Sequence, residues 1–172
     1  IPRTGPAERV ELATHVFDPQ VTGEAETVDC TLDVPMDASL EIKNRRGSIQ
    51  VERIRGQHAW LETTEGHITA SEVSGHLVAR SLGGDIEILH ASGRVEAVSI
   101  TGSLRFIRPT SRNLRGNTNT GRITYVGDFA PGGDYVLSTY SGDIDVTCPE
   151  TASFELRAKT VKGKLDNAVR LT

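Results

Sequence analysis

The sequence predicts an all-β fold, a parallel β-solenoid of about seven coils with two strands in each. Three observations indicate this fold. The 172 residues include 17 glycines and only 5% aromatic residues, which suits thin layers joined by tight turns. A turn of the form (Ser, Thr or Asn)-x-x-Gly recurs with a period of about 18 to 21 residues. Alternating apolar and polar residues flank each turn, as in strands with one buried face.

Each repeat unit consists of a strand, the recurring turn, a second strand and a second turn. The recurring turn occupies residues 44–47, 63–66, 81–84, 99–102, 118–121, 139–142 and 160–163. The positions two and four residues before it are apolar or small, as at Leu40 and Ile42. A second alternating run follows the glycine, as at Ile49 and Val51, and a second turn closes the unit. One unit cannot bury its apolar face alone, so stacked copies must build the core.

The turn residues carry their own expectations. The Ser or Thr points inward, and we expect its hydroxyl to bond the turn backbone or the hydroxyl one coil along. The glycine is expected to supply a positive φ at the corner. The pattern departs from regularity at Ser111, which replaces a corner glycine, and between Gly127 and Gly133, where the turn is longer. The repeat does not fix the register at these two places.

Residues 1–39 lack the period, although residues 28–34 still alternate. We expect capping or flanking strands there and the solenoid over residues 40–172, the two forming one structural domain. The chain begins at Ile1 without an initiator Met. We interpret it as a processed or trimmed chain from which an export signal or membrane anchor could have been removed.

The charges exclude some partners. The net charge is −4 with the signs interspersed, so we expect no basic field and no nucleic-acid partner. No apolar run approaches about 18 residues, and we expect membrane attachment only through an anchor absent from this chain.

The pattern Gly-(x)-Ile-x-Val, turn, Gly-x-Val-x-Ala-x-Thr-x-x-Gly resembles a bacterial family of short β-strand repeats described as adhesins. Residues 66–68, 84–86 and 142–144 and the intervening turns carry the resemblance, which covers about residues 28 to 166. It implies a β-solenoid at the bacterial cell envelope, periplasmic or on the cell surface, with an adhesive role. It implies no catalytic residue.

Candidate chemical sites are few, and we expect neither a metal nor a cofactor. His58, His67 and His76 recur every nine residues, which is half a coil, so His67 should lie on the opposite sheet. His58 and His76 should be neighbours without an evident third ligand. Gly83-Gly84-Asp85 and residues 131–134 are expected to be turns, because no helix follows them.

Two pairs of carboxylates are candidates for a catalytic site. Asp85 and Glu87 share an outward face with Asp143 and Asp145, but three coils separate the pairs by about 14 Å, too far for a glycosidase. Intervening Arg105 and Arg122 predict cross-strand ion pairs on a solvated face.

The two cysteines, Cys30 and Cys148, are expected to be about 20 Å or more apart and unpaired, because a disulfide needs Cα atoms within roughly 7 Å. Cys30 is expected to point inward.

The outward positions provide the candidate partner contacts. Trp60 and Val78 should be neighbours on one sheet, while Leu89, Ile107 and Val126 should form an apolar stripe on the other. Either residues 1–27 fold over a stripe, or it meets a partner or a second copy.

These features favour a non-enzymatic envelope module that binds a protein or glycan. The alternatives are a polysaccharide-acting β-helix enzyme, and a structural module that self-associates end to end through a poorly capped last coil near Leu165.

Overall fold

The computed structural model describes residues 31–155, 157, 159, 164 and 166. The chain divides into two compact units, Ile1–Asp33 and Val34–Thr172. Only three residues of the first unit are described, and Leu32 among them is exposed. The fold described below is that of the second unit.

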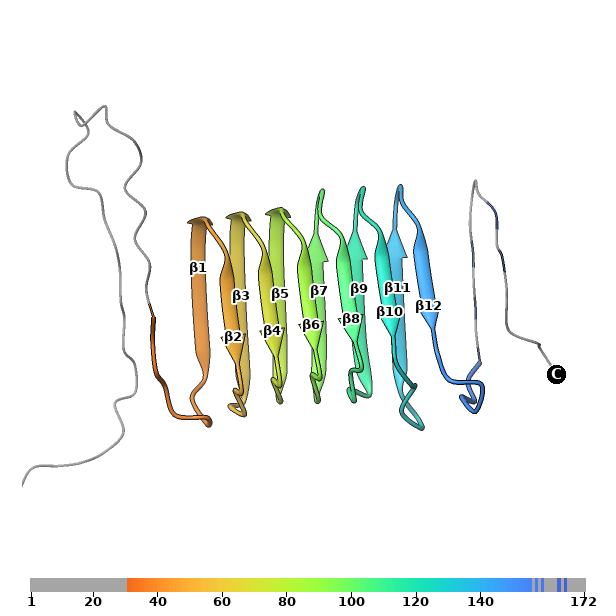
Figure 1. Cartoon of the computed structure of the whole chain (residues 1–172), viewed down its shortest axis with the longest axis horizontal. Coiled ribbons are helices and arrows are strands. Elements are labelled where there is room, and N and C mark those ends of the chain that lie inside the picture. The colour runs from red at the N-terminus through yellow and green to blue at the C-terminus, as the bar shows by residue number, and fades with distance from the viewer. Residues whose placement is uncertain (1–30, 156, 158, 160–163, 165, 167–172) are drawn as a thin grey trace, which may run out of the picture. The chain divides into compact units, whose positions relative to one another are not determined.

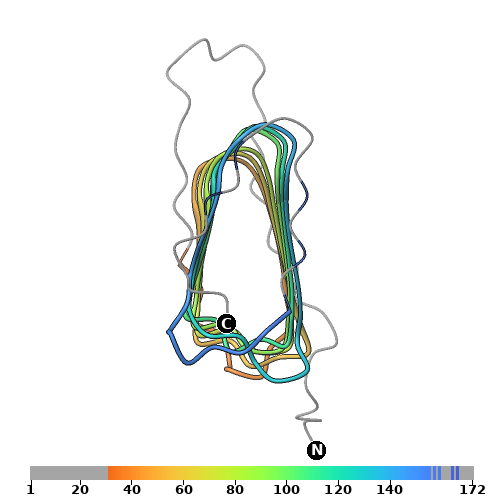
Figure 2. The same ribbon diagram turned by 90° about the vertical axis from the view of Figure 1, so that its right-hand side faces the viewer.

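Twelve short strands form two parallel sheets (Figure 1). Sheet A contains β1 (Leu40–Arg46), β3 (His58–Glu65), β5 (His76–Gly83), β7 (Arg94–Ser99), β9 (Asn113–Thr118) and β11 (Asp134–Thr139), in that order. Sheet B contains β2 (Ile49–Glu52), β4 (Ile68–Ser71), β6 (Ile86–Leu89), β8 (Leu104–Ile107), β10 (Ile123–Val126) and β12 (Ile144–Thr147) in the same direction. Figure 2, along the stack, shows the two sheets facing each other and joined by turns at both edges.

The predicted parallel β-solenoid is confirmed, with six coils among the described residues. Of the seventh unit, expected around residues 156–163, only residues 157 and 159 are described. We call the turns after sheet A strands the upper turns and those after sheet B strands the lower turns, as they stand in Figure 1. Residues 31–39 contain no strand, and the other strands expected before residue 40 fall on residues outside the description.

The coils stack in the register that the alternation predicts. Ala59 of β3 pairs with Leu40 and Leu77 in the neighbouring strands, and Ile86 of β6 pairs with Ile68 and Leu104. Successive inward side chains therefore form columns that are buried from coil to coil. The fully buried members include Leu61, Ile68, Leu77, Ile86, Ile88, Val95, Leu104, Phe106, Leu114, Ile123 and Tyr125. Burial of each large side chain contributes roughly 1.5–3 kcal/mol.

One aromatic ring fits this thin core because the facing strand provides space for it. Phe106 of β8 is fully buried, and Gly116 lies on the inward face of β9. A Cβ at Gly116 would stand 2.8 Å from the Phe106 ring. Ala97 and Ala79, the small residues next to Gly116 in the same column, are also fully buried.

A ladder of buried hydroxyls links the upper turns, as expected. Each hydroxyl donates to the carbonyl oxygen of the turn glycine one coil earlier. The bonds are Thr63 to Gly47 at 3.3 Å, Ser81 to Gly66 at 3.3 Å, Ser99 to Gly84 at 3.1 Å, Thr118 to Gly102 at 2.8 Å and Thr139 to Gly121 at 3.2 Å. The sequence left two partners open for these hydroxyls, the turn backbone or the hydroxyl one coil along, and the structure shows the turn backbone.

The expected positive φ explains some of these turn glycines but not all of them. Gly47 and Gly66 have φ values of 113° and 146°, where glycine is favoured. Gly84 and Gly102 do not show such a φ, yet a Cβ on either would overlap the carbonyl oxygen of the glycine one coil earlier. Close approach between successive turns, as well as backbone conformation, therefore selects glycine.

The two irregular places keep the register. Ser111 is buried, its hydroxyl donates to the carbonyl of Gly93 one coil earlier, and it accepts from the Asn113 N–H at 3.2 Å. Asn113 still pairs with Arg94, so the serine replaces the corner glycine without shifting the strand.

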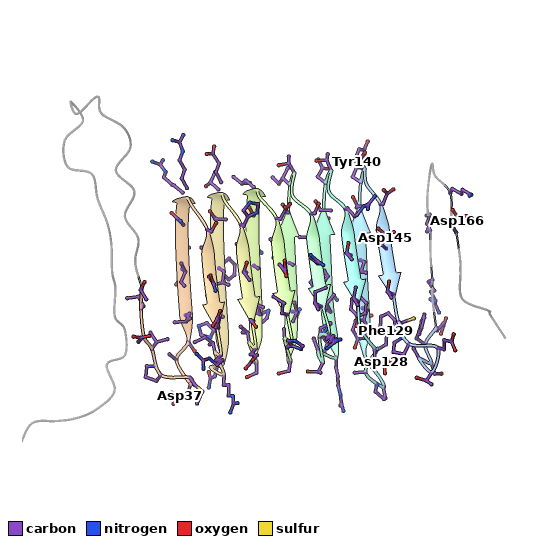
Figure 3. All side chains as sticks on the ribbon, in the orientation of Figure 1. Asp37, Asp128, Phe129, Tyr140, Asp145 and Asp166 are labelled. Carbon is purple, nitrogen blue, oxygen red and sulfur yellow. The ribbon has the colours of Figure 1, made fainter. Side chains whose placement is uncertain are left out.

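The longer turn between Gly127 and Gly133 is held by an aromatic cluster, in the region of Asp128 and Phe129 in Figure 3. Phe129 stacks on Tyr125 with ring centroids 4.9 Å apart and meets Tyr135 edge-on at 4.9 Å. The Tyr135 hydroxyl donates to the Ser111 carbonyl at 2.6 Å and accepts from the Ala130 N–H at 2.8 Å. β11 consequently pairs with β9 along its whole length.

The glycine contact predicts different outcomes at two adjacent residues. We expect Gly84→Ala to lower the free energy of unfolding by about 2–4 kcal/mol, because its Cβ would overlap the Gly66 carbonyl. Gly83→Ala is the matched control, since its Cβ would be 3.6 Å from the nearest atom, and a change within about 1 kcal/mol is expected. Urea unfolding followed by circular dichroism measures both. Equal losses would contradict the assigned contact.

The hydroxyl ladder predicts a second pair of outcomes. Thr118→Val removes a buried donor and leaves the Gly102 carbonyl without it, which we expect to cost about 1–2 kcal/mol. Thr120→Val removes an exposed hydroxyl that lies 3.5 Å from the Ile100 carbonyl and should cost less than about 0.5 kcal/mol. A thermal unfolding series on the two variants distinguishes them, and a neutral Thr118→Val would refute a stabilising ladder.

Candidate functional site

The predicted apolar stripe lies on the outward face of sheet B. Leu89 pairs with Ile107, which pairs in turn with Val126, so the three side chains occupy one column in successive coils. Each is half-buried. Ser71 and Thr147 continue the column on either side, so polar residues border the stripe. The expectation that residues 1–27 cover a stripe falls outside the described residues.

Trp60 and Val78 are neighbours on the outward face of sheet A, as expected. The Arg80 guanidinium lies over the Trp60 ring, 4.7 Å from its centroid, and the indole N–H donates to Glu62 at 3.2 Å. Val78 is only 4% exposed although its side chain points outward. Trp60 is half-buried, so it offers more surface to a partner than Val78 does.

The outward carboxylates are arranged as the repeat predicts. β6, which carries Glu87, and β12, which carries Asp145, are separated by β8 and β10. Arg122 holds Asp143 at 2.9 Å and Asp145 at 3.6 Å, which confirms the expected cross-strand ion pairing at this arginine. Asp85 accepts from the Ser103 N–H at 2.8 Å. These carboxylates therefore neutralise an arginine and satisfy a turn, and they do not converge on a common point.

The surface around these carboxylates is shallow. A hollow of about 240 Å³ lies among Asp85, Glu87, Arg105 and Arg122, and another of about 200 Å³ lies along the lower turns.

Among the described residues, two titratable groups away from these hollows have shifted pKa values. The hydrogen bond from Lys43 to Glu41 raises the pKa of that exposed lysine. Burial raises the pKa of the Tyr125 phenol, whose hydroxyl donates to the Asp128 carbonyl at 2.7 Å. The phenol thus acts as a structural hydrogen-bond donor.

The histidines occupy the predicted places. His58 pairs with His76 on sheet A, and His67 precedes β4 of sheet B, where it accepts from the Asp85 N–H at 3.2 Å. His76 Nε2 is 3.6 Å from a Glu96 oxygen and otherwise has no hydrogen bond. Within the described part of the chain, no three His, Cys, Asp or Glu side chains are placed to hold a metal ion.

Of the two cysteines, Cys148 is free and half-buried, as expected for an unpaired thiol. Cys30 lies outside the described residues.

Sequence reasoning did not single out the residue that follows each sheet B strand. Arg53, Glu72, His90 and Arg108 have φ values of 54°, 53°, 50° and 45°, a left-handed conformation that non-glycine residues seldom adopt. Their N–H groups donate to the adjacent coil, as Arg53 does to Ser71. Each is followed by a buried residue, Ile54 in the first coil. The sequence feature that could have identified these four residues is their constant position, one residue after each of four successive sheet B strands.

The left-handed column predicts a stabilising substitution. Glu72→Asn should raise the free energy of unfolding by about 0.5–1 kcal/mol, because asparagine tolerates positive φ better than glutamate does. Glu87→Asn, in the regular strand β6, is the control and should be neutral or destabilising. Chemical denaturation decides between them. A loss of stability in Glu72→Asn would show that the Glu72 side chain makes a contribution larger than the strain.

The described residues include no helix long and apolar enough to cross a membrane. Comparison of the chain with protein-family models finds no match, and the comparisons with curated proteins and with solved structures find none either.

Proposed function

We propose that this chain is a non-enzymatic, adhesin-like module of a bacterial cell envelope, periplasmic or at the cell surface, that binds a protein or glycan partner through its sheet faces. The resemblance of the repeat to bacterial adhesin repeats supports the location. The column of Leu89, Ile107 and Val126 carries the binding proposal, because three apolar side chains in register lie on an outward face where the repeat otherwise places polar residues.

The sheet faces suit binding better than catalysis. Backbone hydrogen bonds fix each inner strand on both sides, so outward side chains are presented at a constant spacing of about 4.8 Å. A preformed surface of this kind loses little conformational entropy when a partner docks. Glu87 on β6 and Asp145 on β12 stand three strands apart, and Arg122 pairs with both Asp145 and Asp143, which directly precedes β12. A polysaccharide-cleaving site needs two convergent carboxylates.

End-to-end self-association is the second candidate, and one observation favours it. The inward residues Ile144 and Val146 of β12 are 41% and 44% exposed, whereas Ile123 and Tyr125, their partners in β10, are fully buried. Sedimentation velocity tests it, because a module that stacks on itself forms larger species as its concentration rises. The last coil near Leu165, where the sequence predicts this contact, includes Leu165 itself, which lies outside the described residues.

The stripe predicts a selective loss of binding. Ile107→Asp should weaken retention on a glycan array, or on immobilised envelope protein, by about tenfold or more, because it places a charge at the centre of an apolar contact. Gln50→Asp, an exposed change on the same face in the first coil, should alter binding less than about twofold. Circular dichroism confirms that both variants fold.

Two results would contradict the proposal. Unchanged binding in a folded Ile107→Asp variant would move the contact away from the stripe. Release of reducing ends from a polysaccharide, abolished by Glu87→Gln or Asp143→Asn, would establish the enzyme alternative.

A further inference from the structure

The lower turns bring together positive charges that are dispersed in the sequence. Because all sheet B strands run in one direction, residues 53–57, 72–75, 90–93 and 108–112 lie along one edge of the stack (Figure 1). We call these residues the lower turn edge. Four arginines, Arg53, Arg55, Arg108 and Arg112, lie there with one acidic residue, Glu72, and the next lower turn, residues 127–133, adds Asp128.

These four arginines have no ion pair among the residues that the structure describes, and all are exposed. At the opposite edge, Arg46 lies 3.3 Å from Glu65 and Arg122 lies 2.9 Å from Asp143. Arg45, in the first upper turn, is exposed and has no ion pair within the described part of the chain. Two upper-turn arginines thus have acidic partners within the fold, while all four arginines of the lower turn edge remain available to an external anion.

Backbone hydrogen bonds hold the edge in a fixed arrangement. The Ser74 N–H donates to the Ile54 carbonyl at 2.8 Å, and the Ser92 N–H donates to the Val73 carbonyl at 2.9 Å. Arg53 and Arg108 stand in one column three coils apart, which is about 14 Å. Long side chains occupy left-handed positions in this column, where glycine would be less strained, and Gly127 does occupy the next one.

The composition of the edge points to one class of ligand. The hollow of about 200 Å³ along the edge is lined by Arg53, Arg55, Glu72, Ser74, His90 and Ser92, together with Met36. Guanidinium groups bind carboxylate or sulfate, whereas serine hydroxyls and a carboxylate bind neutral hydroxyls. A chain of sugars bearing acidic groups presents both kinds of partner. A continuous phosphate backbone would instead meet Glu72 at the centre of the edge.

We propose that the lower turn edge binds an acidic polysaccharide, with Arg53 and Arg55 engaging one anionic group and Arg108 and Arg112 another. This site is separate from the sheet-face contact proposed above and does not depend on it. Its length, rather than its depth, provides affinity, because the hollow is shallow and the two arginine pairs lie three coils apart.

The test uses the full chain with defined probes at about 0.15 M salt, where weak long-range attraction is screened. Dextran sulfate and polygalacturonate should bind, and neutral dextran should not. The double variant Arg53→Asn with Arg108→Asn should weaken binding by about tenfold or more, since two charge contacts are lost. Asparagine is chosen because it tolerates the positive φ at both positions.

The control removes the same charge from the other edge. Arg46→Gln with Arg122→Gln should change polyanion binding less than about twofold, because these arginines are already paired with Glu65 and Asp143. Ile107→Asp should leave the binding of dextran sulfate and polygalacturonate unchanged, because Ile107 lies on the outward face of sheet B and not on the lower turn edge. A failed sheet-face contact and a failed turn-edge site therefore give different results.

Several outcomes would overturn the proposal. These are no binding of either acidic polysaccharide at this salt concentration, equal losses in the two double variants, and tighter binding to duplex DNA or to vesicles containing anionic lipid than to the polysaccharides.

Discussion

The close backbone contact between successive coils is the constraint on which the other features depend. Parallel strands pair at about 4.8 Å, so each coil must bring its turns to that distance from the turns of its neighbours. A side chain at the upper corner would overlap the carbonyl one coil earlier, and glycine is therefore required at Gly84 and Gly102. The carbonyls that approach so closely are also those that accept from the buried hydroxyls, as Gly102 does from Thr118.

The core follows from the same spacing. Each inward residue has a counterpart directly above and below it, so a column stays buried as long as its members match in size. Phe106 departs from this rule and is accommodated across the core by Gly116. The aromatic cluster of Tyr125, Phe129 and Tyr135 absorbs the extra residues of a longer turn without displacing β11. Irregularity is thus confined to turns and to compensating pairs.

Sequence periodicity predicted the features that repeat with the coil. The strand register, the inward hydroxyls and the neighbours Trp60 and Val78 all follow from alternation and spacing. Features that depend on contacts between coils were less predictable. The approach of Gly84 to the Gly66 carbonyl, the burial of Val78 and the grouping of unpaired arginines at the lower turns arise only when the coils stack. Counting signs along the sequence did not show that Arg53, Arg55, Arg108 and Arg112 gather at one edge.

The direction of the inter-coil hydrogen bonds has a mechanical consequence. They run along the stack, so a force that separates its two ends acts along these bonds, and a terminal coil, which is paired on one side only, has the fewest bonds to hold it. Each coil that detaches exchanges about 4.8 Å of stack for roughly 60 Å of extended chain. A stack built in this way lengthens in steps under tension, and the coils that remain keep their surfaces intact.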